Sequence, residues 1–161
     1  MIISIDPGLS GAIAIFAKGE LLKVQDIPIS AKTYGKGNQI NAALLAEMIY
    51  YWARIDKAII ERVGAMPKQG VVSMLGFGRS IGVIEGVLAG RLIPVEWVTP
   101  QKWKKYHGLT GKDKDAARTL VIEKYPEYAD QFARKKDIGR ADAVLIGLSQ
   151  LQERTHETTR E

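Results

Sequence analysis

The chain has 161 residues, enough for one domain with its own hydrophobic core, and its 46% hydrophobic and 25% charged residues exclude wholesale disorder. The absence of cysteine excludes disulfides, zinc sites with cysteine ligands and a thiol nucleophile. A net charge of +5 is compatible with a polyanionic partner such as nucleic acid.

The first segment of the chain predicts a hairpin of two buried strands around an aspartate. Residues 2–5 are mostly isoleucine, Asp6 follows them, and Pro7-Gly8 marks a turn before a second apolar run at residues 12–16. A carboxylate at the end of a core strand is costly to bury unless a partner compensates it. We therefore expect a metal ion or a phosphate group next to Asp6.

The middle of the chain contains a second apolar run that ends in a carboxylate. Residues 20–27 predict a third strand, residues 31–38 predict a polar loop, and Asn41 suits the N-cap of the helix that follows. Residues 57–63 then predict another buried strand, in which three apolar residues come directly before Glu61. Glu61 therefore stands in a position similar to that of Asp6.

Residues 71–90 predict a helix with an unusual spacing of glycines. Gly78, Gly82, Gly86 and Gly90 recur at every fourth position and would line one side of the helix. Each costs about 1 kcal/mol of helix propensity relative to alanine, so four in register suggest close approach of another backbone. We expect packing on the protein's own sheet, with helix packing across a dimer interface as the alternative.

The last third of the chain predicts a fifth strand and three helices. The strand occupies residues 93–98, and Thr99-Pro100 begins a short helix rich in lysine. Thr110 and Asp113 have the spacing of a capping box for the next helix. The final helix begins near Arg140 and carries a third carboxylate, Asp142, in its first turn.

Together these elements predict an α/β fold with a mixed five-stranded sheet, antiparallel in its first three strands and parallel thereafter, with helices on both faces. We expect one domain over residues 1–151 and a frayed polar tail over residues 152–161. No signal peptide and no membrane span are expected, so the predicted location is the cytoplasm, without a membrane partner.

The three carboxylates are the candidate chemical centre. If the strands that end in Asp6 and Glu61 are neighbours and the last helix crosses them, Asp142 joins the pair. Three carboxylates packed together repel one another, and a divalent cation would turn them into ligands. An all-oxygen set favours Mg²⁺ or Mn²⁺, and a pair of such ions supports phosphodiester cleavage. Taken alone, Asp142 is better explained as a helix-start residue.

Five segments resemble the RuvC-type Holliday junction resolvases, and most closely the branch found in bacteriophages and prophages. The matching segments are IDPGLSG, AIIERV, VTPQKWK, GKDKDAAR and KKDIGRADAVLIG, at residues 5–11, 58–63, 98–104, 111–118 and 135–147. The first motif alone is weak, because actin-like ATPases also place an aspartate and glycines on a first hairpin. The ordered set covers the chain from Met1 to about Leu151.

The resemblance implies an RNase H-like fold and a homodimeric, Mg²⁺-dependent endonuclease that nicks four-way DNA junctions symmetrically, with Mn²⁺ as a substitute ion. It places Asp6, Glu61 and Asp142 on the catalytic, metal-binding carboxylates of the family. The family usually has a fourth acid, in many members three residues before the last one, where this chain has Gly139. Asp137 is the nearest acid and the candidate fourth ligand. The implied location is a bacterial cell, with a phage or a bacterial gene as the source.

Basic residues fit the same interpretation as contacts to DNA phosphates. In the family, lysines of the GKDKDAAR-like segment lie near the scissile phosphate, so Lys114 is the candidate catalytic lysine. Trp103 is expected to pack in the core, and Met66 stands where some family members have an aromatic wedge. The candidate DNA contacts are Lys68, Arg79, Lys102, Lys104, Lys112, Lys114 and Arg118.

Other functions remain open at this point. One alternative is an RNase H-like nuclease that acts on other branched DNA or on structured RNA. A non-enzymatic alternative is an architectural protein that binds junctions and needs none of the carboxylates. No nucleotide cofactor is expected, because the glycine-rich string at residues 76–82 does not follow a strand as a dinucleotide fingerprint would.

Overall fold

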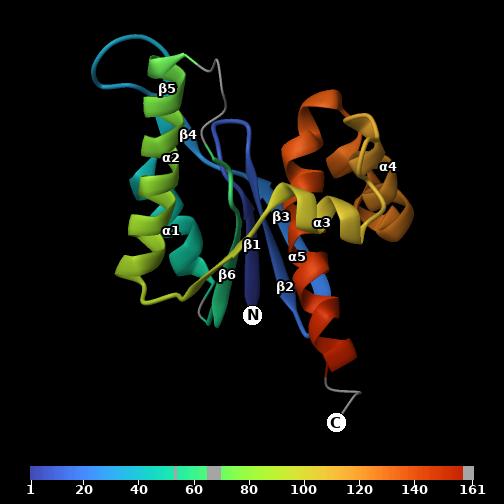
Figure 1. The fold of residues 1–161 in the computed structure, drawn as a ribbon. Coiled ribbons are helices and arrows are strands. Elements are labelled where there is room, and N and C mark those ends of the chain that lie inside the picture. The colour runs from blue at the N-terminus through green and yellow to red at the C-terminus, as the bar shows by residue number, and fades with distance from the viewer. Residues whose placement is uncertain (53, 65–69, 158–161) are drawn as a thin grey trace.

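A five-stranded mixed sheet forms the centre of the molecule in the computed structural model, which describes residues 1–52, 54–64 and 70–157 (Figure 1). The strand order is β3-β2-β1-β6-β7. The strands are β1 (Ile2–Asp6), β2 (Ala12–Ala17), β3 (Glu20–Asp26), β6 (Lys57–Glu61) and β7 (Val95–Val98). The first three pair antiparallel, and β6 and β7 add in parallel, which confirms the predicted fold class.

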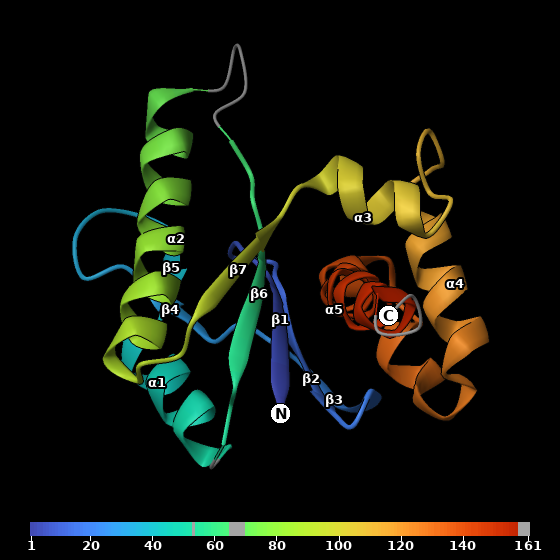
Figure 2. The ribbon, with the colours of Figure 1, turned by 60° about the horizontal axis from the view of Figure 1, so that its bottom comes forward.

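Helices cover both faces of this sheet (Figures 1 and 2). On one side lie α1 (Ala42–Tyr51) and α2 (Val71–Gly90). On the other side lie α3 (Pro100–Tyr106), α4 (Asp115–Lys124) and α5 (Ile138–Glu157), together with the 3₁₀ segments η1 (Pro126–Phe132) and η2 (Lys135–Asp137). The alternation of side chains along β1 produces this layering, because Ile3 and Ile5 pack with α1 and α2 while Ser4 faces α5.

The helix α5 approaches the sheet closely. Ser4 Oγ donates a hydrogen bond of 2.6 Å to Ala143 O, and a Cβ at Gly147 would lie 2.4 Å from the Phe16 ring. A larger residue at position 147 would push the helix away from the sheet. This close packing fixes the N-terminal half of α5 over the ends of β1 and β6.

Two local details differ from the predictions. A short hairpin, β4 (Ile29–Ala31) and β5 (Asn38–Ile40), flanks the predicted polar loop, whose residues 32–37 form no strand, and its three-residue strands are too brief to show a hydrophobic period. The predicted capping box of α4 is replaced by Asp113, the residue before the N-cap Lys114, because its Oδ1 accepts hydrogen bonds from Asp115 N and Ala116 N at 2.9 and 3.0 Å. The predicted Asn41 cap of α1 is confirmed, since its side chain accepts from Leu44 N.

The glycine side of α2 does not pack on the sheet. A Cβ added at Gly78, Gly82, Gly86 or Gly90 would meet no atom of the described residues within 4 Å. The helix instead contacts the core through Ile84 and Leu88, on its opposite side. The expectation that the glycines face the protein's own sheet is therefore wrong.

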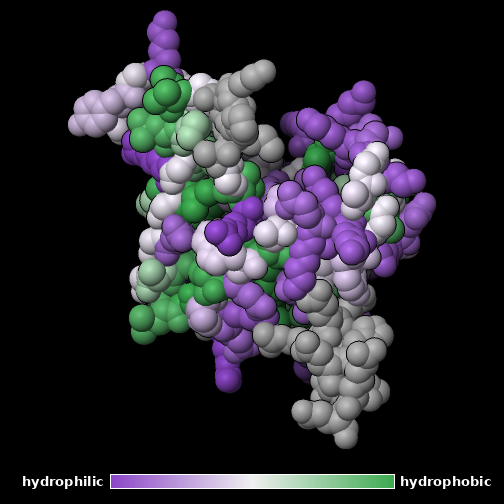
Figure 3. Space-filling model, viewed as in Figure 1, coloured by the Kyte–Doolittle hydropathy of each residue, from purple (hydrophilic) through white to green (hydrophobic). Residues whose placement is uncertain are grey.

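The same helix exposes large apolar residues near its N-terminus. Val71, Val72 and Leu75 are 82%, 80% and 75% exposed, and hydrophobic surface lies over α2 in the space-filling view (Figure 3). Among the described residues, α2 is also long and apolar enough to cross a membrane by length and composition alone, which the sequence analysis did not expect. One such helix is weak evidence for a membrane span; only 17% of its apolar window is buried, and α2 packs against α1.

The last helix extends beyond the predicted domain end. The backbone of α5 is helical to Glu157, six residues into the segment predicted as a frayed tail. The predicted division at residue 151 stays a prediction.

Candidate active site

The fold places Asp6 and Glu61 side by side. Each is the last residue of its strand, and β1 and β6 are parallel neighbours in which Ile5 lies opposite Ile60. The carboxyl ends of neighbouring parallel strands meet at one edge of a sheet, so the two carboxylates share that edge. The helix α5 crosses the same region and brings Asp142 to it. We call Asp6, Glu61 and Asp142 the carboxylate triad.

The three carboxylates influence one another electrostatically. Burial raises the pKa of Asp6 well above its ordinary value, and the charges of Asp142 and Glu61 raise it further. Burial first, and then the charge of Glu61, raises the pKa of Asp142 to about 6. Burial also raises the pKa of Glu61, while a hydrogen bond from Trp103 and the charge of Lys104 oppose that rise. Such mutual repulsion is what a bound cation relieves.

The triad fits a hard divalent cation by the chemistry of its donors, which are all carboxylate oxygens. Within the described parts of the chain, however, no group of three His, Asp or Glu side chains is positioned so that it could hold a metal ion. At Glu61, Oε1 accepts a hydrogen bond of 2.7 Å from Trp103 Nε1. The donor chemistry therefore fits a cation, and the side chains would have to move closer together to bind one.

Lys104 is the basic residue that acts on all three carboxylates. Its ammonium group lies 5.2 Å from the centre of the Trp103 ring, and its charge lowers the pKa of Asp6, Glu61 and Asp142 against the rises above. The sequence placed Lys104 among the DNA contacts and named Lys114 as the catalytic candidate. The structure sets Lys104 closer to the chemistry of the triad than that hypothesis assumed.

A basic cavity of about 520 Å³ opens over this site. Asp6, Asp142 and Trp103 line the cavity. Glu61 is connected to the cavity through the hydrogen bond that it accepts from Trp103. Five lysines also line the cavity: Lys104, Lys112, Lys114, Lys135 and Lys136. Sequence reasoning did not assign the last two, although the basic run before the final helix was a visible signal.

Other predicted DNA contacts lie elsewhere. Arg118 is an internal structural residue, since it pairs with Asp115 and donates a hydrogen bond of 2.9 Å to Phe132 O. Arg79 lines a second cavity, between α2 and the β4–β5 hairpin, and Lys102 is exposed on α3. Lys68 and the predicted wedge Met66 fall outside the described residues.

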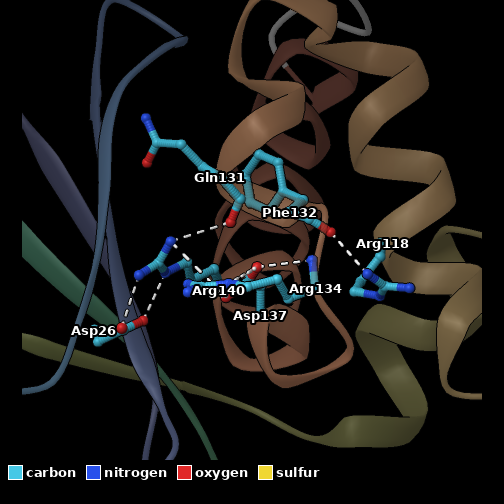
Figure 4. Close-up of polar contacts among 7 residues, drawn as sticks. All are labelled: Asp26, Arg118, Gln131, Phe132, Arg134, Asp137 and Arg140. Carbon is cyan, nitrogen blue, oxygen red and sulfur yellow. Dashed lines mark hydrogen bonds and ion pairs between the residues drawn. The ribbon is translucent and has the colours of Figure 1, made fainter.

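Asp137 is not brought to the triad. It is 2% exposed, accepts a hydrogen bond from the backbone N–H of Arg134 and pairs with the Arg134 guanidinium at 2.8 Å (Figure 4). These contacts lower its pKa, and Arg140 lies 3.9 Å away on its other side. The carboxylate oxygens of Asp137 therefore bind arginine, whereas a metal ligand needs a carboxylate oxygen that is free to bind the ion.

The position that the resemblance assigns to a fourth acid cannot hold one here. A Cβ at Gly139 would lie 2.3 Å from Ser10 O and 3.2 Å from Asp6 Oδ2. The absence of a side chain lets α5 begin directly against the turn between β1 and β2. The described site therefore offers three carboxylates and close backbone where a fourth would stand.

Comparison with known proteins supports the fold. No family model matches the chain, and no curated protein matches it in sequence. A Thermus thermophilus RuvC in complex with a Holliday junction substrate is similar in structure, with a TM-score of 0.60 at 14% identity over 92% of this chain and 90% of that one. A second Thermus thermophilus RuvC structure gives 0.55 at 15% identity, over 92% and 91%.

A viral protein has the same architecture. The Fowlpox virus resolvase, in complex with Holliday junction DNA, gives a TM-score of 0.53 at 19% identity over 95% of this chain and 99% of that one. These similarities cover nearly the full length of each protein. The chain has the RNase H-like fold of the junction resolvases, with its carboxylate triad at the edge where β1 and β6 end.

Proposed function

We propose that this protein is a metal-dependent endonuclease that resolves four-way DNA junctions. The observation that carries the proposal is that Asp6 and Asp142 line one cavity together with five lysines, while the charge of Glu61 acts on both aspartates. The structural neighbours from Thermus thermophilus and Fowlpox virus were both solved with junction DNA, which supports the same substrate class here.

The proposed chemistry assigns different tasks to the acidic and the basic residues. Asp6, Glu61 and Asp142 would hold Mg²⁺, or Mn²⁺ in its place, which supplies an activated water and stabilises the leaving oxygen of the phosphodiester. Lys104 stands next to these carboxylates and would contact the reacting phosphate, with Lys114 at the cavity wall. The remaining lysines would hold the flanking backbone phosphates.

We also propose that two copies of the chain act together, with the glycine side of α2 as their contact. Two nicks require two sites, and each chain supplies one. Leu75 lies seven residues before Gly82 and therefore on the same side of the helix. This side offers an exposed apolar side chain next to glycines whose backbone another helix can approach closely. A second copy of the chain would cover this surface. The proposal also includes a location in the cytoplasm of a bacterial cell.

The decisive experiment compares substrates under one set of conditions. A labelled mobile four-way junction, a Y-fork, a linear duplex and an RNA–DNA hybrid are each incubated with the protein in Mg²⁺, and with EDTA as the control. We expect paired, symmetric nicks in the junction and none with EDTA. Faster cleavage of the fork or the hybrid would favour the broader nuclease, and binding without cleavage in both Mg²⁺ and Mn²⁺ would favour the architectural protein.

A further inference from the structure

Trp103 is completely buried, so its indole N–H needs a hydrogen-bond partner, and the identity of that partner is informative. Its side chain is 0% exposed, and packing alone accounts for a large aromatic residue at such a place. Its indole N–H, which can donate one hydrogen bond, donates it to Glu61 Oε1 at 2.7 Å. The partner is thus a member of the carboxylate triad, on a strand 42 residues earlier in the chain.

The helix that carries Trp103 is fastened at both ends. At its start, Thr99 caps α3, because its hydroxyl accepts a hydrogen bond from Lys102 N. At its end, His107 Nε2 lies 2.8 Å from Leu145 O, and since a carbonyl oxygen accepts, the ring nitrogen donates to α5. The indole is therefore held in a fixed place between the sheet and α5.

Glu61 needs such a fixed partner more than the two aspartates do. A glutamate has one more rotatable bond than an aspartate, and Glu61 stands at the open end of its strand. A buried, immobile N–H selects one arrangement of its carboxylate and occupies Oε1. The second oxygen, Oε2, then remains to be offered toward Asp6 and Asp142.

We propose that Trp103 is a positioning residue for metal binding: its indole N–H holds Oε1 of Glu61 so that Oε2 completes the site formed with Asp6 and Asp142. The inference depends on the proposed function, because it presumes that the triad holds a divalent cation. The ring of Trp103 contributes to the same site, since the ammonium group of Lys104 lies over it, 5.2 Å from its centre. One indole thereby places an acidic and a basic group relative to each other.

The test removes the N–H while it keeps the ring. At position 103 the tryptophan is replaced by 3-benzothienylalanine, which has sulfur in place of the N–H and nearly the same shape, and in a second variant by phenylalanine, Trp103→Phe. Trp52→Phe is the matched control, because Trp52 packs in the other core cluster, with α1 and α2. Thermal unfolding of each variant checks that it is folded.

The first measurement is the binding of Mn²⁺ alone, by calorimetry on the protein without DNA. Partners that orient a metal ligand are worth about 10- to 100-fold in affinity. We expect both Trp103 variants to lose at least about tenfold and Trp52→Phe to bind as the wild type does. In junction cleavage, the Mg²⁺ concentration for half-maximal rate rises by a similar factor, while the rate at saturating Mg²⁺ changes less.

A second readout follows the indole directly. In a ¹⁵N spectrum, the Nε1–H resonance of Trp103 is expected to move on titration with Mg²⁺, whereas that of Trp52 stays in place. A folded benzothienylalanine variant with wild-type affinity for Mn²⁺ would overturn this inference and leave the proposed function standing. A wild-type protein that neither binds Mn²⁺ nor cuts junctions would overturn the proposed function, and this inference with it.

Discussion

Asp137 and Asp142 are five residues apart, yet the fold gives them opposite environments. The Arg134 guanidinium and backbone hold the pKa of Asp137 below its ordinary value, whereas burial and the charge of Glu61 raise the pKa of Asp142 to about 6. Arg140, which lies between them in the sequence, pairs with Asp26 at 2.6 Å and so ties the start of α5 to β3 (Figure 4). Spacing along the sequence therefore does not decide which acid serves the site.

The role of Asp137 is open to a direct test by Asp137→Asn. We expect the free energy of unfolding to fall by about 1–3 kcal/mol at pH 7, because a buried charge-assisted hydrogen bond is lost. This stabilisation is lost as pH falls through the lowered pKa of Asp137, so the variant and the wild type converge in acid. Denaturant unfolding measures the stability and calorimetry the Mn²⁺ affinity, which we expect to be unchanged. Loss of Mn²⁺ binding at wild-type stability would instead identify Asp137 as a ligand.

The triad should destabilise the metal-free protein at neutral pH. The folded state binds a proton at Asp142 up to about pH 6, whereas the unfolded state releases it near 3.8, so stability falls as pH rises between these values. We expect Asp142→Asn to be more stable than the wild type by about 2–3 kcal/mol at pH 7 in EDTA, with no difference near pH 4. Urea unfolding of both proteins between pH 4 and pH 7 measures this difference in stability. If the free energies of unfolding of the two proteins changed with pH in parallel, Asp142 would not be destabilised by burial and by the charge of Glu61.

Some site residues were accessible from the sequence and others were not. Asp6 and Glu61 were predictable because each follows an apolar run that had to be a buried strand. The hydrogen bond from the Trp103 indole to Glu61 could not be predicted, because the spacing of apolar residues indicates burial and does not identify the partner of a single N–H group. The same holds for Gly139, whose meaning depends on the carbonyl of Ser10, far away in the chain.

At the scale of elements, α2 shows where a pattern predicts a helix but not its orientation. The helix over residues 71–90 is confirmed, yet four glycines in register fit a sheet contact as well as a solvent-facing side. The packed side is decided by Ile84 and Leu88, whose burial depends on the sheet beneath them. The β4–β5 hairpin was missed for another reason, because strands of three residues are too short to show a hydrophobic period.

The exposed side of α2 gives a prediction about assembly. We expect the wild type to sediment at twice 17.8 kDa and Gly82→Glu to sediment at 17.8 kDa, because a charged side chain blocks close helix approach. Analytical ultracentrifugation measures both. Leu22→Glu is the matched control, since it adds the same charge at an exposed site on β3 and should leave the dimer intact. A monomeric wild type, or a dimeric Gly82→Glu, would contradict the proposed contact.

At the scale of the whole molecule, the layers separate two surfaces. The α1 and α2 side exposes apolar residues, whereas the lysine-lined cavity lies on the side of α3, α4 and α5. Figure 2 shows these helices on opposite faces of the sheet, and Figure 3 shows hydrophobic surface over α2 and hydrophilic surface over α3 and α4. The overall fold was predictable because the order of strands and helices restricts the topology to few choices. The clustering of five lysines around one cavity was not predictable, since they come from α3, from the loop before α4 and from η2.

The lysine cavity should make junction binding sensitive to salt. Each neutralised phosphate contributes about −0.9 to the slope of log affinity against log salt concentration. We expect Lys135→Gln with Lys136→Gln to weaken binding and reduce this slope by up to about 2. Lys18→Gln with Lys23→Gln, in the β2–β3 hairpin and outside the lining of the cavity, is the control and should keep the wild-type slope. Equal slopes for the two double variants would exclude the cavity as the DNA contact.

We propose that the partly buried carboxylates at the ends of β1 and β6 cut DNA with the help of a divalent ion. The most direct measurement is cleavage of a labelled mobile four-way junction in Mg²⁺ by the wild type and by Asp6→Asn, with binding followed by gel shift. We expect paired, symmetric nicks by the wild type and a loss of more than about 100-fold in the cleavage rate of Asp6→Asn, with binding retained, because a direct ligand matters more than its outer partners. Cleavage at the wild-type rate by a folded Asp6→Asn protein would contradict this proposal.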